Sequence, residues 1–473
     1  MFRTKKLLLQ FFNYYQLDTK ALAFMRIALA LVILADLWIR GGDLAAFYGE
    51  EGVLPSRLMF QFAGKSGIWT LCTLFQHFNW IVFLFVLNVI AAISFLIGYQ
   101  TKISNLILWI LCLSFQNRNL YILQGGDDLV RLLLFFGLFL PWHQQLSIDT
   151  PAKIKNWHQR LAQLAYLLLV ASVYFFSVNL KSSSQWHSEG SALYYALSID
   201  VLVGPFGKWL YHYPELMKVL THAVYVIEWI LPILILWPSK KGYLRLLAFL
   251  MILLLHLGFA LFLNVGLFFI ISIVSGIGLI PGQWLKRQSF KPSIKTSRKS
   301  KFEKFFDLTK LAFISVCIFL SLFVNLSMMP WFHYQPKKEI IFSINFLRLD
   351  QFWAMFAPAV PTQSKWLVYQ AYNAKGQQYD IKNNSEYVDF NKPNYFGDFF
   401  KNDRWRKLAE NVGDDRYTFL RAHYCLYFLE TWNKQHPKKI MSTLNLYSMS
   451  QNTEATYKSA IIHKKILCVC DEH

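Results

Sequence analysis

The residues of this sequence that could do chemistry are ionisable side chains inside or beside long apolar runs. Lys181 follows directly after one such run, Glu228 lies inside a second, and His256 lies well inside a third. Ionisable groups are expensive to hold in hydrocarbon and are therefore candidates for function. Any chemistry of this chain is accordingly expected from proton-carrying groups in or beside a membrane.

Further candidates stand near the ends of other apolar runs. Asp127 and Arg131 are spaced i,i+4, so they can pair on one helix face. His222 stands at the start of the run that contains Glu228. The full set of expected pocket residues comprises Asn117, Asp127, Asp128, Arg131, Trp186, His222 and Glu228, beside Lys181 and His256 as the catalytic candidates.

Each candidate also has a purely structural interpretation. The acidic pair 127–128 with Arg131 can form a helix cap plus an ion pair. Lys181 can extend its ammonium from a helix end to the lipid headgroups. Glu228 and His256 can satisfy each other, or a backbone carbonyl, with no ligand involved. These alternatives remain open at the level of the sequence.

Familiar catalytic motifs of soluble enzymes are not found in the chain. There is no Walker loop, dinucleotide fingerprint, nucleophile elbow or zinc-ligand helix. The six cysteines do not describe a disulfide framework. Cys468 and Cys470 form a Cys-x-Cys near the C-terminus that could bind a metal or change redox state, or simply end a strand. No metal site is expected.

Composition places these residues in a membrane protein. The chain is 55% hydrophobic and only 16% charged, whereas an average soluble domain has about 25% charged residues. A net charge of +20 in a soluble protein would suggest nucleic acid. In a membrane protein, Lys and Arg accumulate in cytoplasmic loops instead, so no nucleic-acid partner is expected.

The elements that must position the candidates are nine apolar runs of about the length of a spanning helix. No cleavable signal peptide is evident, and residues 1–20 are expected as an amphipathic segment at the membrane interface. The predicted spans are roughly 21–39, 79–98, 102–117, 128–142, 161–180, 219–237, 243–263, 265–281 and 308–328.

Positive charge predicts the orientation of these spans. With the N-terminus inside, the inner segments hold 19 Lys and Arg residues and the outer loops hold 7. This asymmetry favours a cytoplasmic N-terminus, a cytoplasmic basic linker and an outer C-terminal part. The expected parts are an interfacial segment (1–20), a transmembrane domain (21–282), the basic linker (283–307), a last span (308–328) and a soluble domain (329–473).

The soluble part is predicted as α+β. The stretch WLVYQAYNAKGQQYDI alternates apolar and polar residues around Asn373 to Gly376, which indicates a hairpin. Helices are expected on both sides of Gly413, and two further strands are expected in IMSTLNLYSM and ATYKSAIIHKKILCVC. The predicted fold is therefore a polytopic α-helical membrane protein with about nine transmembrane helices and a C-terminal α+β domain.

Several linked segments resemble one family. They are RIALALVILADLWIRGGDLAAFYGEEGVLP, QNRNLYILQGGDDLVRLLLFFGLFLP, NLKSSSQWHSEGSALYYALSID and HLGFALFLNVGLFFIISIVSGIGLIPGQW, followed by FWAMFAPAVP. In this order they resemble the horizontally transferred transmembrane domain, the bacterial branch of the vitamin K-dependent γ-carboxylase superfamily. The resemblance covers about 20–285 well and continues more loosely to the end.

The resemblance implies a quinone-dependent chemistry. In the carboxylases a lysine deprotonates vitamin K hydroquinone, dioxygen adds, and the quinone ends as its epoxide. The strong base so formed removes a γ-proton from a peptide glutamate, and carbon dioxide attacks the carbanion. Lys181 matches the lysine position and His256 matches a histidine of the family. The chain departs from the family at Gln124–Asp128, where the carboxylases carry Asn-Asn-His-Ser, and its soluble part is shorter.

Two hypotheses follow. The first is an enzyme of a bacterial inner membrane that oxidises a reduced vitamin K or related quinol to its epoxide with Lys181 as base, together with carboxylation of glutamate in a protein substrate. Its partners would be membrane lipids and an isoprenoid quinone, with dioxygen and carbon dioxide as co-substrates. The second is a non-catalytic lipid-binding membrane module whose outer domain docks a partner protein.

Overall fold

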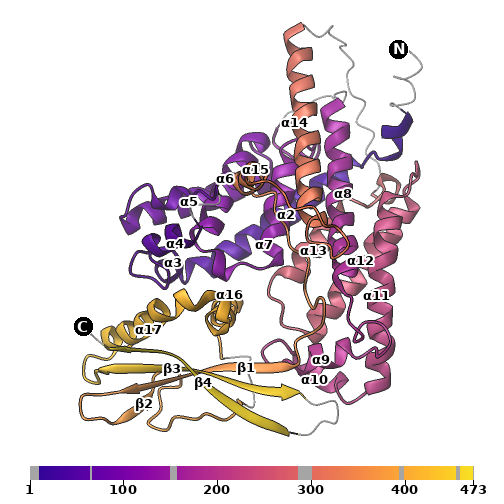
Figure 1. The fold of residues 1–473 in the computed structure, drawn as a ribbon. Helices are drawn as coiled ribbons and strands as arrows, with labels where there is room; N and C mark the ends of the chain where they lie inside the picture. The colour runs from indigo at the N-terminus through magenta and orange to yellow at the C-terminus, as the bar shows by residue number, and fades with distance from the viewer. Residues whose placement is uncertain are drawn as a thin grey trace.

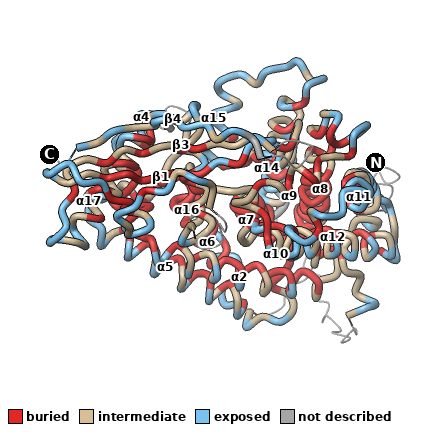
Figure 2. The backbone as a smooth tube through the Cα atoms, turned by 90° about the horizontal axis from the view of Figure 1, so that it is seen from below, coloured by how far each residue is buried: buried red, intermediate tan, exposed pale blue. Residues whose placement is uncertain are grey.

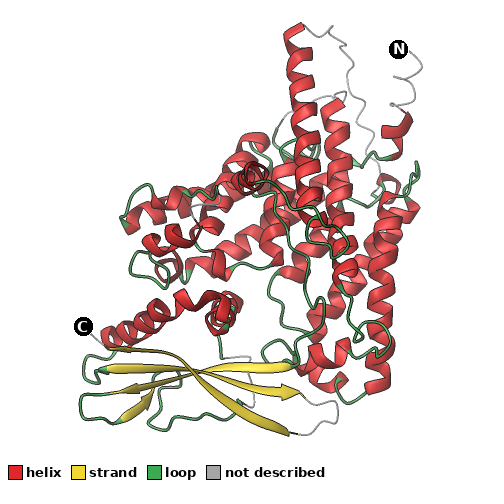
Figure 3. Cartoon of the chain, viewed as in Figure 1, coloured by secondary structure: helices red, strands yellow, loops and turns green. Residues whose placement is uncertain are grey.

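The protein consists of a helical body and a smaller layer that contains its only described sheet (Figures 1 and 3). The computed structural model describes most of the chain, and the predicted basic linker lies largely outside the described residues. So do the first nine residues of the expected interfacial segment. The described residues are 10–63, 67–149, 157–285, 301–393, 399–453 and 459–471.

Six helices are long and apolar enough to cross a membrane. At 1.5 Å per residue, their 20 or more residues cover the roughly 30 Å of a hydrocarbon core. Several present apolar side chains outward, among them Leu250 and Leu254, which are 49% and 68% exposed. These six helices are compatible with the expected multi-pass membrane protein: α2 (Thr19–Gly41), α5 (Phe78–Ile97), α8 (Trp157–Leu180), α11 (Pro214–Leu236), α12 (Tyr243–Phe262) and α14 (Lys301–Leu326).

The other three expected spans form shorter or more polar helices in the same body. The helix α7 (Gly125–Gly137) has 13 residues and α13 (Phe268–Ile277) has 10, which give only about 20 and 15 Å. The helix α6 (Thr101–Arg118) has 18 residues but buries polar side chains such as Asn105 and Gln116. An apolar run of this length is equally suited to a buried helix, so nine spanning helices remain a prediction.

The helices differ in the share of their residues that is buried. On α8 most residues are buried, whereas α11 and α12 bury only a narrow face, and Figure 2 shows this contrast along the chain. The helix α8 therefore forms the centre of the body, with α11 and α14 packed on it. Short helices connect the long ones: α3 (Leu44–Tyr48), α4 (Ser56–Ala63), α9 (Ala192–Ser198), α10 (Pro205–Leu210) and α15 (Lys338–Leu347).

The C-terminal domain is α+β, as predicted. Its strands pair antiparallel in the order β2-β1-β3-β4, and the predicted hairpin is the β1–β2 turn. The C-terminal domain also has two α-helices, which lie between its sheet and the helical body (Figure 1). The elements are β1 (Gln363–Tyr372), β2 (Gln378–Asp380), α16 (Asp403–Gly413), α17 (Arg421–Gln435), β3 (Thr443–Thr453) and β4 (Ser459–Asp471).

The domain packs on one end of the body. Lys401 contacts Asp43 at 2.6 Å, and the ring of Trp405 lies 4.7 Å from that of Phe47. These residues of the body belong to the loops expected on the outer side, whereas the start of α14 lies at the opposite end from the sheet (Figure 1). The sheet and the expected outer loops thus share one end of the molecule.

Candidate functional site

One face of α8 carries a row of polar side chains. Tyr174, Ser177 and Lys181 are spaced three and four residues apart, so they project from the same side of the helix. Lys181 follows the last residue of α8 and turns back, so that its Nζ donates to Ser177 Oγ at 2.8 Å. The row faces α11, which is packed closely on α8.

Lys181 forms an ion pair with Glu228 of α11. Ser177 Oγ donates to Glu228 Oε2 at 3.1 Å, so the three side chains form one hydrogen-bonded group. Lys181 and Glu228 are each 4% exposed, and the ammonium lies 4.9 Å from the ring centroid of Trp186. The ammonium therefore points into the protein, which contradicts the interpretation that Lys181 extends to the headgroups.

A segment of the domain linker covers this group. The indole of Trp186 donates to the Phe356 carbonyl at 2.9 Å. The Val360 amide donates to Gln185 Oε1 at 2.7 Å, and the Ser183 amide donates to the Pro358 carbonyl at 3.2 Å. The FWAMFAPAVP segment thus closes the loop after Lys181 from the side of the sheet.

His256 lies at the inner end of the polar row. Its Nε2 is 3.0 Å from the hydroxyl of Tyr174, and its Nδ1 has no hydrogen-bond partner among the described residues. Glu228 bonds to Ser177 and Lys181 instead, so Glu228 and His256 do not satisfy each other. The two expected catalytic residues, Lys181 and His256, are therefore joined to the same face of α8, two turns apart.

His222 lies apart from the row. It neighbours Gly190, in the loop after Lys181, where a Cβ atom would approach His222 Nε2 to 2.8 Å. Gly190 has a φ of +67°, a conformation that glycine adopts without strain. The close passage of the loop and the backbone conformation both require the glycine there.

Asp127 belongs to a different cluster. It accepts from Arg40 at 2.6 Å and from Arg404 of α16 at 3.0 Å, and its second oxygen caps α7 at the Gln124 amide. It does not pair with Arg131, contrary to the i,i+4 expectation. Arg404 also pairs with Asp36, so two arginines and two carboxylates meet between the helical body and the C-terminal domain.

Asp128 and Arg131 join a third group. Arg131 pairs with Asp128 and, at 3.0 Å, with Asp350, whose carboxylate also accepts from Arg348 at 2.9 Å. Burial alone would raise the pKa of Asp350, but Arg131 and Arg348 outweigh it, and the pKa is lowered. Arg348 also donates to Asn117. Three of the expected pocket residues, Asn117, Asp128 and Arg131, thus connect the chain after α15 to α6 and α7.

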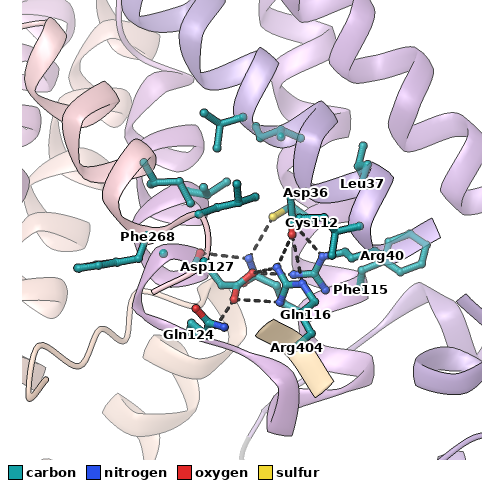
Figure 4. A pocket seen from close by; sticks show the side chains of 18 of the residues that line it. Asp36, Leu37, Arg40, Cys112, Phe115, Gln116, Gln124, Asp127, Phe268 and Arg404 are labelled. Atoms are coloured by element: carbon teal, nitrogen blue, oxygen red, sulfur yellow. Dashed lines mark hydrogen bonds and ion pairs between the residues drawn. The ribbon is translucent and has the colours of Figure 1, made fainter. Parts of the chain in front are cut away.

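A cavity of about 120 Å³ adjoins the Asp127 cluster (Figure 4). Its walls are mostly apolar, and Asn88 contributes a buried Oδ1 that has no partner among the described residues. Phe268 lines it as well, and its ring lies 5.6 Å from that of His256. The lining is completed from α2, α6, α7, α13 and α16, including Asp36, Arg40, Cys112, Gln116, Gln124, Asp127, Asp403 and Arg404.

The expected residues therefore fall into separate groups. Lys181 contacts Glu228 and Trp186, and two turns earlier on the same face of α8 Tyr174 contacts His256. Sequence reasoning missed the two polar residues of α8, although their spacing with Lys181 was visible, and it missed Arg404 entirely. Among the described residues no cluster of His, Cys, Asp and Glu has the arrangement of a metal site.

Comparison with known proteins gives no relative. No family model, no curated protein and no solved structure matches the chain.

Proposed function

We propose that this protein is a membrane enzyme similar to the bacterial branch of the vitamin K-dependent γ-carboxylase superfamily, using Lys181 as base towards a reduced isoprenoid quinone. One observation carries the proposal: Lys181 is buried and paired with Glu228 at the end of a helix long enough to span a membrane. The charge asymmetry of the loops supports a bacterial inner membrane with the N-terminus cytoplasmic and the sheet domain outside.

The pair explains how a lysine can serve as a base. An ammonium group has no lone pair, so Lys181 must first lose a proton. Glu228 lies at hydrogen-bond distance and can take it, which turns the ion pair into a neutral amine and a neutral acid. The neutral amine can accept the proton of a quinol hydroxyl.

The donor set suits a hydroxylic head group. Besides the pair, Ser177 and Tyr174 offer hydroxyls on the same helix face, and the second nitrogen of His256 has no hydrogen-bond partner within the described part of the chain. A reduced quinone supplies a phenolic proton, two electrons and, with dioxygen, the route to an epoxide. If glutamate carboxylation with carbon dioxide is coupled to it, a protein substrate would approach from the sheet domain, which packs on the same end of the body.

One observation favours the alternative, a non-catalytic lipid-binding module. The described cavity is lined by Asp36, Arg40, Asp127 and Arg404 and not by Lys181. In that case the apolar walls would hold a lipid, and Lys181–Glu228 would be a structural pair. The two functions differ in what happens to a bound quinol, and this difference can be measured.

The test uses full-length protein in lipid nanodiscs supplied with menaquinol or vitamin K hydroquinone in air. Mass spectrometry should detect quinone epoxide with the wild type and none with Lys181→Ala. Lys218→Ala is the matched control, because Lys218 is an exposed lysine near the start of α11. This variant should retain wild-type turnover. Glu228→Gln should lower turnover strongly.

Two outcomes separate the functions. Epoxide formation that survives Lys181→Ala overturns the role of the lysine. If the wild type forms no epoxide with either quinol but retains bound lipid in native mass spectra, the lipid-binding module replaces the enzyme.

A further inference from the structure

Cys425 meets Cys468 and Cys470, two cysteines much later in the sequence, in the sheet domain. The Sγ atoms of Cys470 and Cys425 lie 2.7 Å apart. Cys425 is in the first half of α17 and Cys470 is near the end of β4, and Figure 1 shows this end of the chain beside α17. The separation is shorter than a contact between two unbonded sulfur atoms and approaches the roughly 2.05 Å of a disulfide.

The strand and the helix together produce this meeting. Alternate residues of a strand share one face, so Cys468 and Cys470 both point from β4 towards α17. Cys468 Sγ lies 3.3 Å from the Arg421 carbonyl of that helix. Cys425 is fully buried, whereas Cys468 and Cys470 are partly exposed. One buried cysteine therefore faces two cysteines that are partly exposed.

We propose that Cys425 and Cys470 form a redox-active dithiol that oxidises to a disulfide, with Cys468 as the competing thiol. The Cys-x-Cys sequence is compatible with a metal site and with a redox role. The contact between Cys470 and Cys425 favours the redox role. Among the described residues no metal-site cluster includes these cysteines. Two sulfur atoms already in contact need little movement to bond.

The order of the two steps follows from exposure. The oxidant is a small or protein disulfide. The Cys470 thiolate attacks one of its sulfur atoms, one thiol leaves, and a mixed disulfide forms. The Cys425 thiolate then attacks Cys470 Sγ, and the second thiol leaves. Overall two protein thiols lose two electrons and two protons, and the oxidant's disulfide becomes two thiols.

The electrostatics of the two thiols agree with this order. The hydrogen bond with Cys425 lowers the pKa of Cys470, although burial opposes the shift. Hydrogen bonds with Cys468 and Cys470, together with burial, raise the pKa of Cys425. Cys470 is thus the thiolate that forms first, and Cys425 gains reactivity once Cys470 has been converted to a mixed disulfide.

The bond would join the edge of the sheet to its covering helix. The strand β4 pairs only with β3 within the described residues, and α17 follows α16, which carries Arg404 into the body. A Cys425–Cys470 disulfide would fix this edge strand to the helix pair that holds the domain against the membrane helices.

The experiment incubates full-length protein in detergent with oxidised glutathione, followed by acid quenching, denaturation, N-ethylmaleimide treatment and peptide mass spectrometry. The expected product is a Cys425–Cys470 cross-linked peptide, with Cys468 alkylated or bound to glutathione. Cys72, Cys112 and Cys317 are internal controls, because they lie in the helical body and should remain fully alkylated. Oxidised protein should also unfold at a higher temperature than reduced protein.

Two serine variants complete the test. Cys468→Ser should form the same cross-link as the wild type and show the same thermal shift. Cys470→Ser should lose both, while its reduced form unfolds at the wild-type reduced temperature. The proposal is overturned if Cys425 stays alkylated in excess oxidised glutathione, or if Cys425–Cys468 is the main cross-link in the wild type.

Discussion

Arg404 of the C-terminal domain donates two hydrogen bonds to the carboxylate of Asp127 in the helical body, from Nη2 to Oδ1 at 3.0 Å and from Nη1 to Oδ2 at 3.2 Å. Such a two-point contact fixes orientation as well as distance. Arg404 also bonds to Asp36, and the neighbouring Arg40 bonds to both carboxylates. The domain is therefore held by a charge cluster that both parts of the protein complete.

Replacing Arg404 with alanine should weaken the attachment of the C-terminal domain to the helical body. It leaves Asp36 and Asp127 with only Arg40, and removing one member of a buried ion pair costs about 3–5 kcal/mol. Hydrogen exchange should rise in α16, and thermal unfolding should begin at a lower temperature. Arg416→Ala is the control: its side chain is 77% exposed, and an exposed pair contributes about 0–1 kcal/mol. Equal effects of the two substitutions would contradict the cluster's role.

The Lys181–Glu228 pair should behave as a unit in stability. Lys181→Met and Glu228→Gln each leave one buried charge without its partner, which costs about 3–5 kcal/mol. The double variant buries no charge, so it should be more stable than either single variant, while turnover stays absent. Chemical unfolding of all four proteins measures the coupling. Simple additivity of the two single effects would show that the groups do not interact.

The group around Asp350 should make the protein sensitive to acid. Its folded pKa is lowered, since Arg131 and Arg348 outweigh burial, so it lies below the unfolded value of about 4. The ionised carboxylate thus stabilises the fold fully above that value, and this contribution is lost as pH falls through the folded pKa. The melting temperature should exceed that of Asp350→Asn at pH 7, and the difference should shrink below about pH 4. A difference that grows on acidification would reverse the assigned direction.

Tyr174→Phe should destabilise the helical body. His256 Nδ1 already has no partner among the described residues, and the substitution removes the hydroxyl at Nε2 as well. A buried polar group left without its partner costs about 1–3 kcal/mol. Tyr99→Phe is a matched control, because Tyr99 is 53% exposed and should change the unfolding free energy by less than about 0.5 kcal/mol. Equal stability of the two variants would show that the Tyr174–His256 contact is weak.

Much of the fold could be predicted because its signals are local. Apolar length identified the six long helices, and alternation identified the strands and the hairpin at Asn373–Gly376. Length decides less for α7 and α13, since an apolar run does not reveal whether lipid or protein will surround it. Many of their residues pack inside the helical body, and their crossing of a membrane remains a prediction.

The sequence predicted many residues of the candidate site, but it predicted less well which of them are in contact. Lys181 and Glu228 were conspicuous because charges are rare in apolar runs. The two residues are 47 positions apart in sequence, so their pairing depends on how α8 and α11 pack. Asp127 was paired wrongly by spacing, because its carboxylate caps α7 and faces Arg40. Arg404 gave no signal, since a charged residue on an amphipathic helix of a soluble domain is ordinary.

The cavity beside Asp127 couples ligand binding to the contact between the helical body and the C-terminal domain. Its walls come from membrane helices on one side and from Asp403 and Arg404 on the other. A molecule that fills it touches both parts, so its binding energy adds to the energy of docking. The relation is reciprocal: whatever moves the C-terminal domain away from the helical body weakens ligand binding by the same factor. Occupancy of the cavity and the position of the sheet domain are then two measures of one equilibrium.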